Sequence, residues 1–248
     1  MRTTALASAL LAAAAAVIGL AVPAATSSAA PAAHTFVPMN HNGQAVAVRA
    51  VHGFNQNGYN WSGYVTTGSG FTSVSATWVQ PAAKCNSSND LYAPWVGIDG
   101  YGSSSVEQTG VQTDCSSGSP VDSAWYEMYP ANPVYYSNPV SAGDSITASV
   151  SRSGTSYTLT LKDNTKNWTK TTTKSYRGSN ASAEFILESP PAAYPNFGTV
   201  NFTGATVNGK SLSSFSTTAF DASGNSGAYE DHTGALSGGN FSVTYERE

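Results

Sequence analysis

Acidic side chains occur together with large aromatic side chains in three short segments of the chain, at residues 95–99, 125–129 and 184–188. In a β-strand, successive side chains point to opposite faces, so each segment would present one apolar face and one face that mixes acids with aromatic rings. Such a mixture is typical of a concave cleft that binds an extended polymer; the alternative is that the rings form a second, smaller core. The side chains on this mixed face are Trp95, Asp99, Trp125, Glu127, Tyr129, Glu184, Ile186 and Glu188.

Two of these acids, Glu184 and Glu188, lie four residues apart on one predicted strand, which places them about 13 Å apart. The two carboxyl groups of a glycosidase lie about 5–9.5 Å apart. Glu184 and Glu188 therefore do not form such a pair, and a catalytic partner for Glu188 must come from another strand.

Histidine is too scarce for several common catalytic sites. His34, His41 and His52 precede residue 58, and only His232 follows, in a Gly- and Ser-rich stretch that we interpret as a surface loop. A Ser-His-Asp or Cys-His site needs a histidine beside the nucleophile. No His, Cys and Asp residues have the spacing of a zinc site, and no glycine loop resembles a phosphate cradle. We therefore expect no metal and no cofactor, and the catalytic groups that remain are carboxylates, amides and tyrosines.

The elements that position these side chains are predicted to be strands. In Ser145–Val150 and Ser156–Leu161, apolar residues alternate with Ser and Thr, and Gly, Pro, Asn and Ser clusters bound many similar segments. No segment after residue 60 shows the 3.6-residue repeat of an amphipathic helix. Many short strands with regular turn signals predict an all-β fold, either a sandwich or a barrel.

The chain is predicted to have three parts. Residues 1–30 combine a basic residue, an Ala-rich apolar stretch and small residues, as in an export signal peptide; a transmembrane anchor is the alternative. Residues 31–57 show weak periodicity and are interpreted as a propeptide or a flexible N-terminal arm. Residues 58–248 are long enough for one large β-domain. We expect a secreted, extracellular protein whose mature form is a monomer and is not bound to a membrane.

The charge of the chain argues against one class of partner. Charged residues make up 10% of the sequence, and the net charge at pH 7 is −4. Nucleic-acid binding needs a basic face, so no nucleic-acid partner is expected.

The two cysteines, Cys85 and Cys115, are expected to form a disulfide, because exported proteins fold in an oxidising environment. A catalytic thiol is the alternative, but it would need one of the scarce histidines as its partner.

Five motifs occur in order along the chain and carry a family resemblance. They are NWSG at residues 60–63, WVGIDG at 95–100, QTG at 108–110, AWYEMYP at 124–130 and AEFILE at 183–188. Together they resemble the eqolisins, a family of glutamic peptidases, from about residue 60 to the C-terminus and most weakly after residue 205. The resemblance implies a β-sandwich of two antiparallel sheets (jelly-roll or concanavalin-like) with a concave cleft on one sheet. It also implies secretion, peptide-bond hydrolysis in acid and protein or peptide substrates.

The resemblance further implies roles for individual residues. Gln108 of the QTG motif and Glu188, the second acid of the AEFILE motif, correspond to the catalytic pair. Contacts with substrate are expected from Trp95, Asp99, Trp125, Glu127, Tyr129 and Glu184. The sequence departs from the family pattern at Glu107, where an apolar residue is usual, at Met128, where an aromatic residue is usual, and at Ser123 and Ser189, where acids are usual.

Two other functions stay open from the residue pattern alone. A jelly-roll glycoside hydrolase could pair Glu188 with Glu127 or Asp99 across neighbouring strands. A non-catalytic carbohydrate-binding module could stack the same aromatic rings on sugars and would need no catalytic base.

Overall fold

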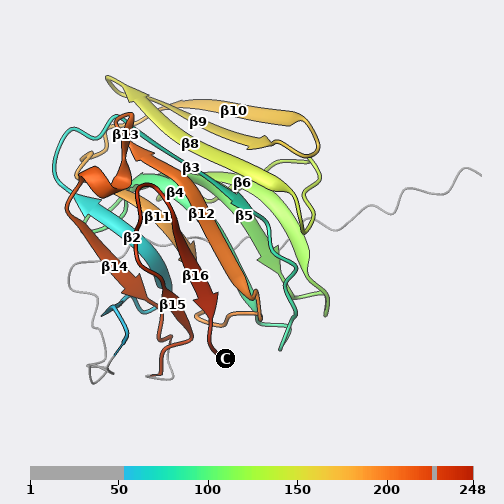
Figure 1. The fold of residues 1–248 in the computed structure, drawn as a ribbon. Helices are drawn as coiled ribbons and strands as arrows, with labels where there is room; N and C mark the ends of the chain where they lie inside the picture. The colour runs from blue at the N-terminus through green and yellow to red at the C-terminus, as the bar shows by residue number, and fades with distance from the viewer. Residues whose placement is uncertain (1–52, 225–227, 248) are drawn as a thin grey trace, which may run out of the picture. The chain divides into compact units, whose positions relative to one another are not determined.

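A computed structural model of the protein describes residues 53–224 and 228–247, and within these ranges the chain folds into strands and one 3₁₀ turn, η1 (Leu212–Ser214). The strands form two sheets that pack face to face (Figure 1). Sheet 1 contains, in spatial order, β1 (Gln56–Asn57), β14 (Thr217–Asp221), β2 (Trp61–Thr67), β11 (Ser182–Glu188), β4 (Leu91–Asp99), β5 (Val106–Asp114), β6 (Val121–Tyr129) and β7 (Val134–Tyr135). Sheet 2 contains β10 (Trp168–Ser175), β9 (Ser156–Asp163), β8 (Ser145–Ser153), β3 (Ser73–Val79), β12 (Thr199–Val207), β16 (Phe241–Tyr245) and β15 (Asp231–Thr233), with β13 (Lys210–Ser211) paired to β12.

The fold class is the one predicted, an all-β sandwich. Neighbouring strands are antiparallel throughout the described pairs, except that β1 runs parallel to β14. The alternation seen in the sequence decides which side chains fill the core. In β8 and β9, Ile146, Ala148 and Val150 face Leu159 and Leu161 on the buried side, where they join the main core between the sheets. Burial of this apolar surface is the chief force that holds the two layers together.

The outer face of sheet 2 is covered by Ser and Thr side chains. Several of them hydrogen-bond across neighbouring strands, as Thr77 does with Thr147 (2.8 Å between the hydroxyl oxygens). The other cross-strand hydroxyl pairs are Thr158 with Thr173, Thr160 with Thr171 and Thr199 with Thr244. This face is called the hydroxyl face below.

The predicted disulfide is present. Cys85 and Cys115 are bonded, with 5.7 Å between their Cα atoms. The bond ties the segment that follows β3 to the end of β5, one of the strands that carries the predicted catalytic residues.

Residues just before 58, the domain boundary expected from the sequence, also contact the sandwich. Gln56 and Asn57 form β1 and pair with β14, while Phe54 stacks on Tyr229 with 4.3 Å between the ring centroids. The backbone and side-chain nitrogens of Asn55 both donate to the buried carboxylate of Asp221. These contacts link residues about 170 positions apart, so local periodicity could not reveal them. The expected signal peptide at 1–30 and most of the expected arm at 31–57 lie outside the described residues.

Across the described part of the chain, the fold contains no helix of the length and hydrophobicity that crossing a membrane requires.

Candidate active site

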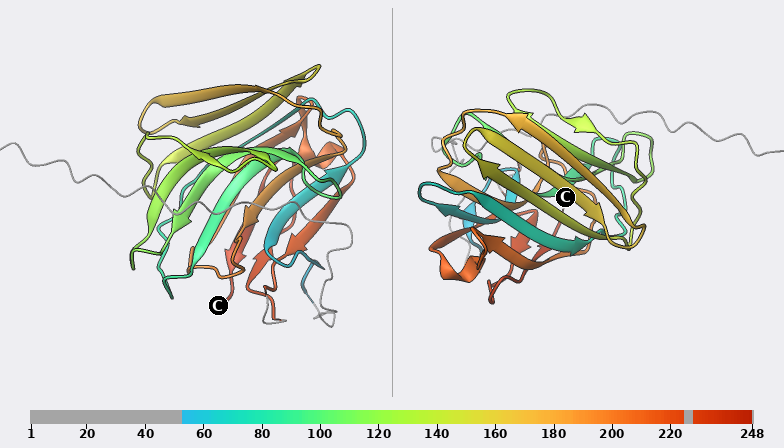
Figure 2. Two further views of the ribbon diagram at one scale, coloured as in Figure 1. Left: turned by 180° about the vertical axis from the view of Figure 1, so that it is seen from behind. Right: turned by 90° about the horizontal axis from the view of Figure 1, so that it is seen from above.

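The mixed acidic and aromatic side chains gather on the outer face of sheet 1, the face turned away from sheet 2 (Figure 2, left, shows sheet 1 from this side). The predicted alternation is confirmed, because Val96 and Phe185 point into the main core while Trp95 and Ile186 point outward. We call the outer face of sheet 1 the site face. Its second apolar cluster contains Trp61, Val65, Leu91, Ala93, Trp95, Val106, Trp125, Ile186 and Phe220, with Tyr101, Tyr129 and Tyr135 packed against it.

The aromatic rings therefore form a second buried cluster, as the alternative prediction had it, and the polar groups among them are buried too. Gln108, Glu127, Glu184 and Glu188 each have 0% of their surface exposed. Buried polar side chains that serve only a structural role are almost always fully hydrogen-bonded. The hydrogen bonds of this face therefore decide whether it is only a second core.

Four residues of the site face stand in one row across four adjacent strands. Glu184 on β11 is opposite Gly97 on β4, Gly97 is opposite Gln108 on β5, and Gln108 is opposite Glu127 on β6. Gln108 donates through Nε2 to Oε2 of Glu127 at 2.7 Å, which fixes the orientation of the amide. The amide oxygen of Gln108 accepts no hydrogen bond from any residue in the described ranges.

Glu188 lies on the same face, four residues further along β11, and is opposite Trp61 on β2 and Ala93 on β4. Its Oε2 accepts a hydrogen bond from Nε1 of Trp95 at 3.1 Å, and its Oε1 accepts one from Nδ2 of Asn60 at 3.3 Å. Both donors are uncharged, so they hold the carboxylate without neutralising it.

The indole ring of Trp95 spans the space between the two predicted catalytic groups. At one end its Nε1 bonds Glu188; at the other end its Cζ3 would lie 2.9 Å from a β-carbon added to Gly97, which would also lie 3.2 Å from Cβ of Gln108. A β-carbon on Gly110 would lie 2.7 Å from Cβ of Trp95 and 2.2 Å from the Pro94 carbonyl oxygen. Gly97 is needed because the Trp95 ring packs against it. Gly110 is needed because Pro94 and Trp95 of the neighbouring strand β4 lie too close for a side chain. The Trp95 ring therefore bonds Glu188 at one end and lies at its other end over Gly97, the residue opposite Gln108.

Besides the amide oxygen of Gln108, two buried donors of the site face have no partner among the described residues. They are Nε1 of Trp61 and Nε2 of Gln112. Leaving a buried donor unpaired costs about 1–3 kcal/mol each. The oxygen of Gln112 accepts from the hydroxyl of Tyr135 at 2.7 Å, so its amide is held in one orientation. The site face therefore holds buried polar groups without partners among the described residues, unlike a core whose polar groups are all hydrogen-bonded.

Glu184 is the second acid of the row and is held differently from Glu188. Its Oε1 accepts from the backbone N–H of Tyr101 at 3.2 Å, and Oε2 has no partner among the residues that the structure describes. Burial raises the pKa of Glu184 well above its ordinary value. A carboxyl that is protonated over the acid range can donate a hydrogen bond, but it cannot act there as a base.

Asp99 does not follow the strand alternation and does not join the site face. It is the last residue of β4, with φ of +63°, and its carboxylate accepts from the backbone N–H groups of Asn180 (2.8 Å) and Ala181 (2.9 Å). The left-handed backbone turns the side chain toward the loop before β11. Asp99 thus anchors that loop, and its expected contact with substrate stays a prediction.

Glu107 precedes Gln108 and takes the opposite face of β5, so its carboxyl group is fully buried on the core side. Burial, and then the charge of the nearby Asp99, raise the pKa of Glu107 to about 8. This buried acid stands where an apolar residue is usual in the family that the sequence resembles, and it had no predicted function.

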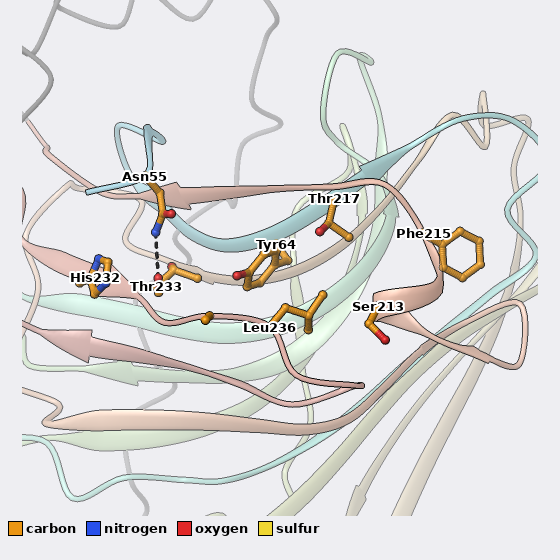
Figure 3. Close-up of a pocket in the computed structure, with 9 residues that line it drawn as sticks. Asn55, Tyr64, Ser213, Phe215, Thr217, His232, Thr233 and Leu236 are labelled. Carbon is orange, nitrogen blue, oxygen red and sulfur yellow. Dashed lines mark hydrogen bonds between the residues drawn. The ribbon is translucent and has the colours of Figure 1, made fainter. Parts of the chain in front are cut away.

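The sequence predicted that His232 lies in a surface loop, but it is part of β15. Its Nδ1 lies 3.0 Å from Oδ2 of the buried Asp221. It lines a cavity of about 580 Å³ at the edge of the sandwich, together with Asn55, Tyr64, Ser213, Phe215, Thr217, Thr233, Ala235 and Leu236 (Figure 3). None of the predicted catalytic or substrate-binding residues lines this cavity.

The described residues contain no group of three or more His, Cys, Asp or Glu side chains arranged to hold a metal ion. The structure adds three polar residues to the site that had no predicted role, namely Asn60, Trp61 and Gln112. The first two belong to the NWSG motif, so their motif was a usable signal; Gln112 shares the alternation of β5 with Gln108 and could have been found from that pattern.

Comparison with known proteins gives a consistent result. A sequence profile described as the peptidase A4 family matches residues 59–245. Aspergillopepsin-2 from Aspergillus niger is 28% identical to this chain over 219 residues, which cover 75% of this chain and 77% of the relative. Scytalidopepsin B from Scytalidium lignicola is 39% identical over 136 residues, which cover 52% of this chain and 51% of the relative.

Solved structures show the same similarity. Scytalido-glutamic peptidase with a transition state analog inhibitor matches with a TM-score of 0.67 and 28% identity, covering 76% of this chain and 99% of that one. A structure of SCP-B, a member of the eqolisin family, in complex with the tripeptide Ala-Ile-His matches with a TM-score of 0.64 and 27% identity, with the same coverage.

Proposed function

The chain belongs to the peptidase A4 family, the glutamic peptidases or eqolisins, and we propose that it hydrolyses peptide bonds with Glu188 and Gln108 as its catalytic pair. The observation that supports this pairing is that both side chains lie on one buried face, where the Trp95 ring bonds Glu188 at one end and lies over Gly97, the residue opposite Gln108, at the other. A glycoside hydrolase or a carbohydrate-binding module, the two alternatives from the residue pattern, receives no support from the relatives, which are peptidases.

In the proposed mechanism, the Glu188 carboxylate takes a proton from a water molecule while the water oxygen attacks the carbonyl carbon of the scissile bond. The resulting tetrahedral intermediate carries a negative oxygen. Glu188, now protonated, passes its proton to the amide nitrogen, and the carbon–nitrogen bond breaks to give a free amine and a free carboxylic acid. This proton transfer returns Glu188 to its ionised form, ready for the next water molecule.

Gln108 has two tasks in this mechanism, and its bond to Glu127 is compatible with both. One N–H is engaged by Glu127, which leaves the amide oxygen to accept a hydrogen bond from the attacking water and the other N–H to donate to the developing oxyanion. Because Glu127 fixes the amide in advance, no reorientation is needed during the reaction.

We propose peptides and proteins as substrates, with the unpaired donors of Trp61 and Gln112 contacting the peptide backbone. Trp95, Trp125 and Tyr129 would provide the apolar walls. Glu184 would act as a protonated hydrogen-bond donor next to them.

Acid activity and secretion are part of the proposal. A catalyst that relies on a carboxyl group without a histidine works in acid, because glutamate ordinarily ionises near pH 4. The sequence of residues 1–30 supports export, and the chain from residue 31 to the start of the described domain is proposed to be a propeptide. N-terminal sequencing of the secreted, active protein tests both assignments.

The decisive experiment is digestion of casein between pH 2 and 7 by the wild-type protein and by Glu188→Gln. The variant should be inactive with unchanged circular dichroism, and Glu246→Gln, at an exposed position, should retain full activity as the matched control. Gln108→Ala should lower kcat by at least about 100-fold, the usual effect of losing one oxyanion donor. An active Glu188→Gln protein would remove Glu188 from the mechanism.

A further inference from the structure

Asn60 lies at the turn just before β2 and contacts the proposed catalytic base directly. Its side-chain Nδ2 donates to Oε1 of Glu188 at 3.3 Å, on the opposite oxygen from the one held by Trp95. We infer that Asn60 is a positioning residue, which fixes the Glu188 carboxylate and favours its ionised form. This inference rests on the proposed role of Glu188 and adds a residue that had no predicted role.

The backbone of Asn60 is tied to the same segment that its side chain contacts. Its carbonyl oxygen accepts from the N–H of Ser189 at 3.0 Å and from the hydroxyl of Tyr194 at 2.7 Å. Asn60 therefore contacts both Glu188 and the next residue in the chain, so its backbone is held where the side-chain amide reaches Oε1 of Glu188. Tyr194 is fully buried, so its hydroxyl is held in place against the carbonyl oxygen of Asn60.

The turn that presents Asn60 is equally constrained. The N–H of Trp61 donates to the carbonyl oxygen of Gly58 at 2.9 Å, and a β-carbon on Gly58 would lie 2.0 Å from the carbonyl oxygen of Trp61. Tyr59, between them, has φ of +56°, and its carbonyl oxygen accepts from the N–H groups of Ser223 and Gly224. A turn fixed at both ends can hold an amide in one position throughout the reaction.

The electrostatics explain why such a donor is needed. Burial disfavours the charged form of a carboxyl group, and Glu188 is fully buried. Hydrogen bonds donated to the carboxylate oppose this effect, and Asn60 and Trp95 each provide one.

The test is the pH profile of kcat/KM for Asn60→Leu, which keeps a similar volume but loses the donor. A general base must be ionised to work, so activity falls on the acid side as the base becomes protonated. A hydrogen bond to a charged group is worth about 1.5–3 kcal/mol, which corresponds to about one to two pH units. The acid limb of the profile should therefore move to higher pH by about one to two units, with KM changed little.

Two further variants complete the design. Asn60→Ala removes the same donor with a smaller side chain and should shift the acid limb in the same direction, which covers the case in which leucine does not fit. Asn201→Leu makes the same change on the hydroxyl face, where the side chain is exposed, and should leave the profile unchanged. Thermal unfolding of each variant separates a loss of stability from a shift of the profile.

The outcomes are distinguishable. If Glu188→Gln is inactive but both Asn60 variants keep the wild-type acid limb, the role of Asn60 is refuted and the proposed function stands. If Glu188→Gln remains active, the proposed function itself is refuted. A shifted limb in both Asn60 variants with an inactive Glu188→Gln supports the inference.

Discussion

Replacing Glu107 by glutamine should prevent a large part of the stability loss that the wild-type protein undergoes between acid and mildly alkaline pH. The carboxyl group of Glu107 lies on the core side of β5, among Asp99 on β4, Tyr157 on β9 and the loop before β11. A β-carbon on Gly178 in that loop would lie 2.5 Å from Oδ2 of Asp99, 2.5 Å from the hydroxyl of Tyr157 and 3.0 Å from Oε2 of Glu107. Arg152 is the nearby cation that favours ionisation of Glu107, but burial and Asp99 outweigh it.

The size of the effect follows from the pKa. The pKa of Glu107 rises from an ordinary 4.5 to about 8 in the folded protein, a difference of about 3.5 units. The folded state therefore binds more protons than the unfolded state between these two values, so stability is greatest below about pH 4.5 and falls as the pH rises to 8. At 1.36 kcal/mol per unit, Glu107 alone accounts for a loss of up to about 5 kcal/mol. Glutamine has the shape of the protonated acid and does not ionise.

The assay is urea unfolding at pH 4 and pH 8, in a Glu188→Gln background so that self-digestion does not interfere. At pH 4 the Glu107→Gln protein should be about as stable as its parent. At pH 8 it should be more stable by several kcal/mol, while Glu246→Gln, an exposed control, should match its parent at both pH values. An equal loss of stability from pH 4 to pH 8 with and without Glu107 would refute the reasoning.

Three other changes test separate parts of the structure. Gly110→Ala should lower the unfolding temperature markedly, because the new methyl group would overlap the Pro94 carbonyl oxygen at 2.2 Å. Overpacking of this kind usually costs about 1–3 kcal/mol, and a wild-type melting curve would contradict the prediction. Replacing Cys85 and Cys115 together by alanine should cost about 3–4 kcal/mol in urea unfolding, as expected for a closed loop of 30 residues; no change in the midpoint would show that the bond is dispensable. Glu127→Ala removes the acceptor that orients the catalytic amide and should lower kcat by about tenfold or more with little change in KM; a change confined to KM would assign this acid to substrate binding instead.

The strand pattern predicted most of the fold and the sides on which side chains lie. Trp95 and Val96 were assigned to opposite faces, and the structure places them in different apolar clusters. Such predictions succeed because the alternation of a strand is local. Asp99 was misplaced because its positive φ ends the alternation at the last residue of β4.

The contacts that refine the site could not be predicted, because they join residues far apart in sequence. Asn60 and Glu188 are separated by 128 positions, and Asn55 and Asp221 by 166. No periodicity connects such residues, since their proximity depends on the order of strands in the sheet. Glu107 illustrates a second limit: its type suggests a solvated surface, whereas the register of Gln108 on the site face directs it into the core.

The hydroxyl face of sheet 2 has a consequence for how the molecule tolerates a change of medium. Hydroxyl groups of Ser and Thr neither gain nor lose protons between neutral and strongly acid solution, so pairs such as Thr77 with Thr147 keep their hydrogen bonds at either extreme. The whole chain has only 11 Lys and Arg and 4 His, so little mutual repulsion develops when its carboxylates are neutralised. The charge of the hydroxyl face therefore changes little between strongly acid and neutral solution.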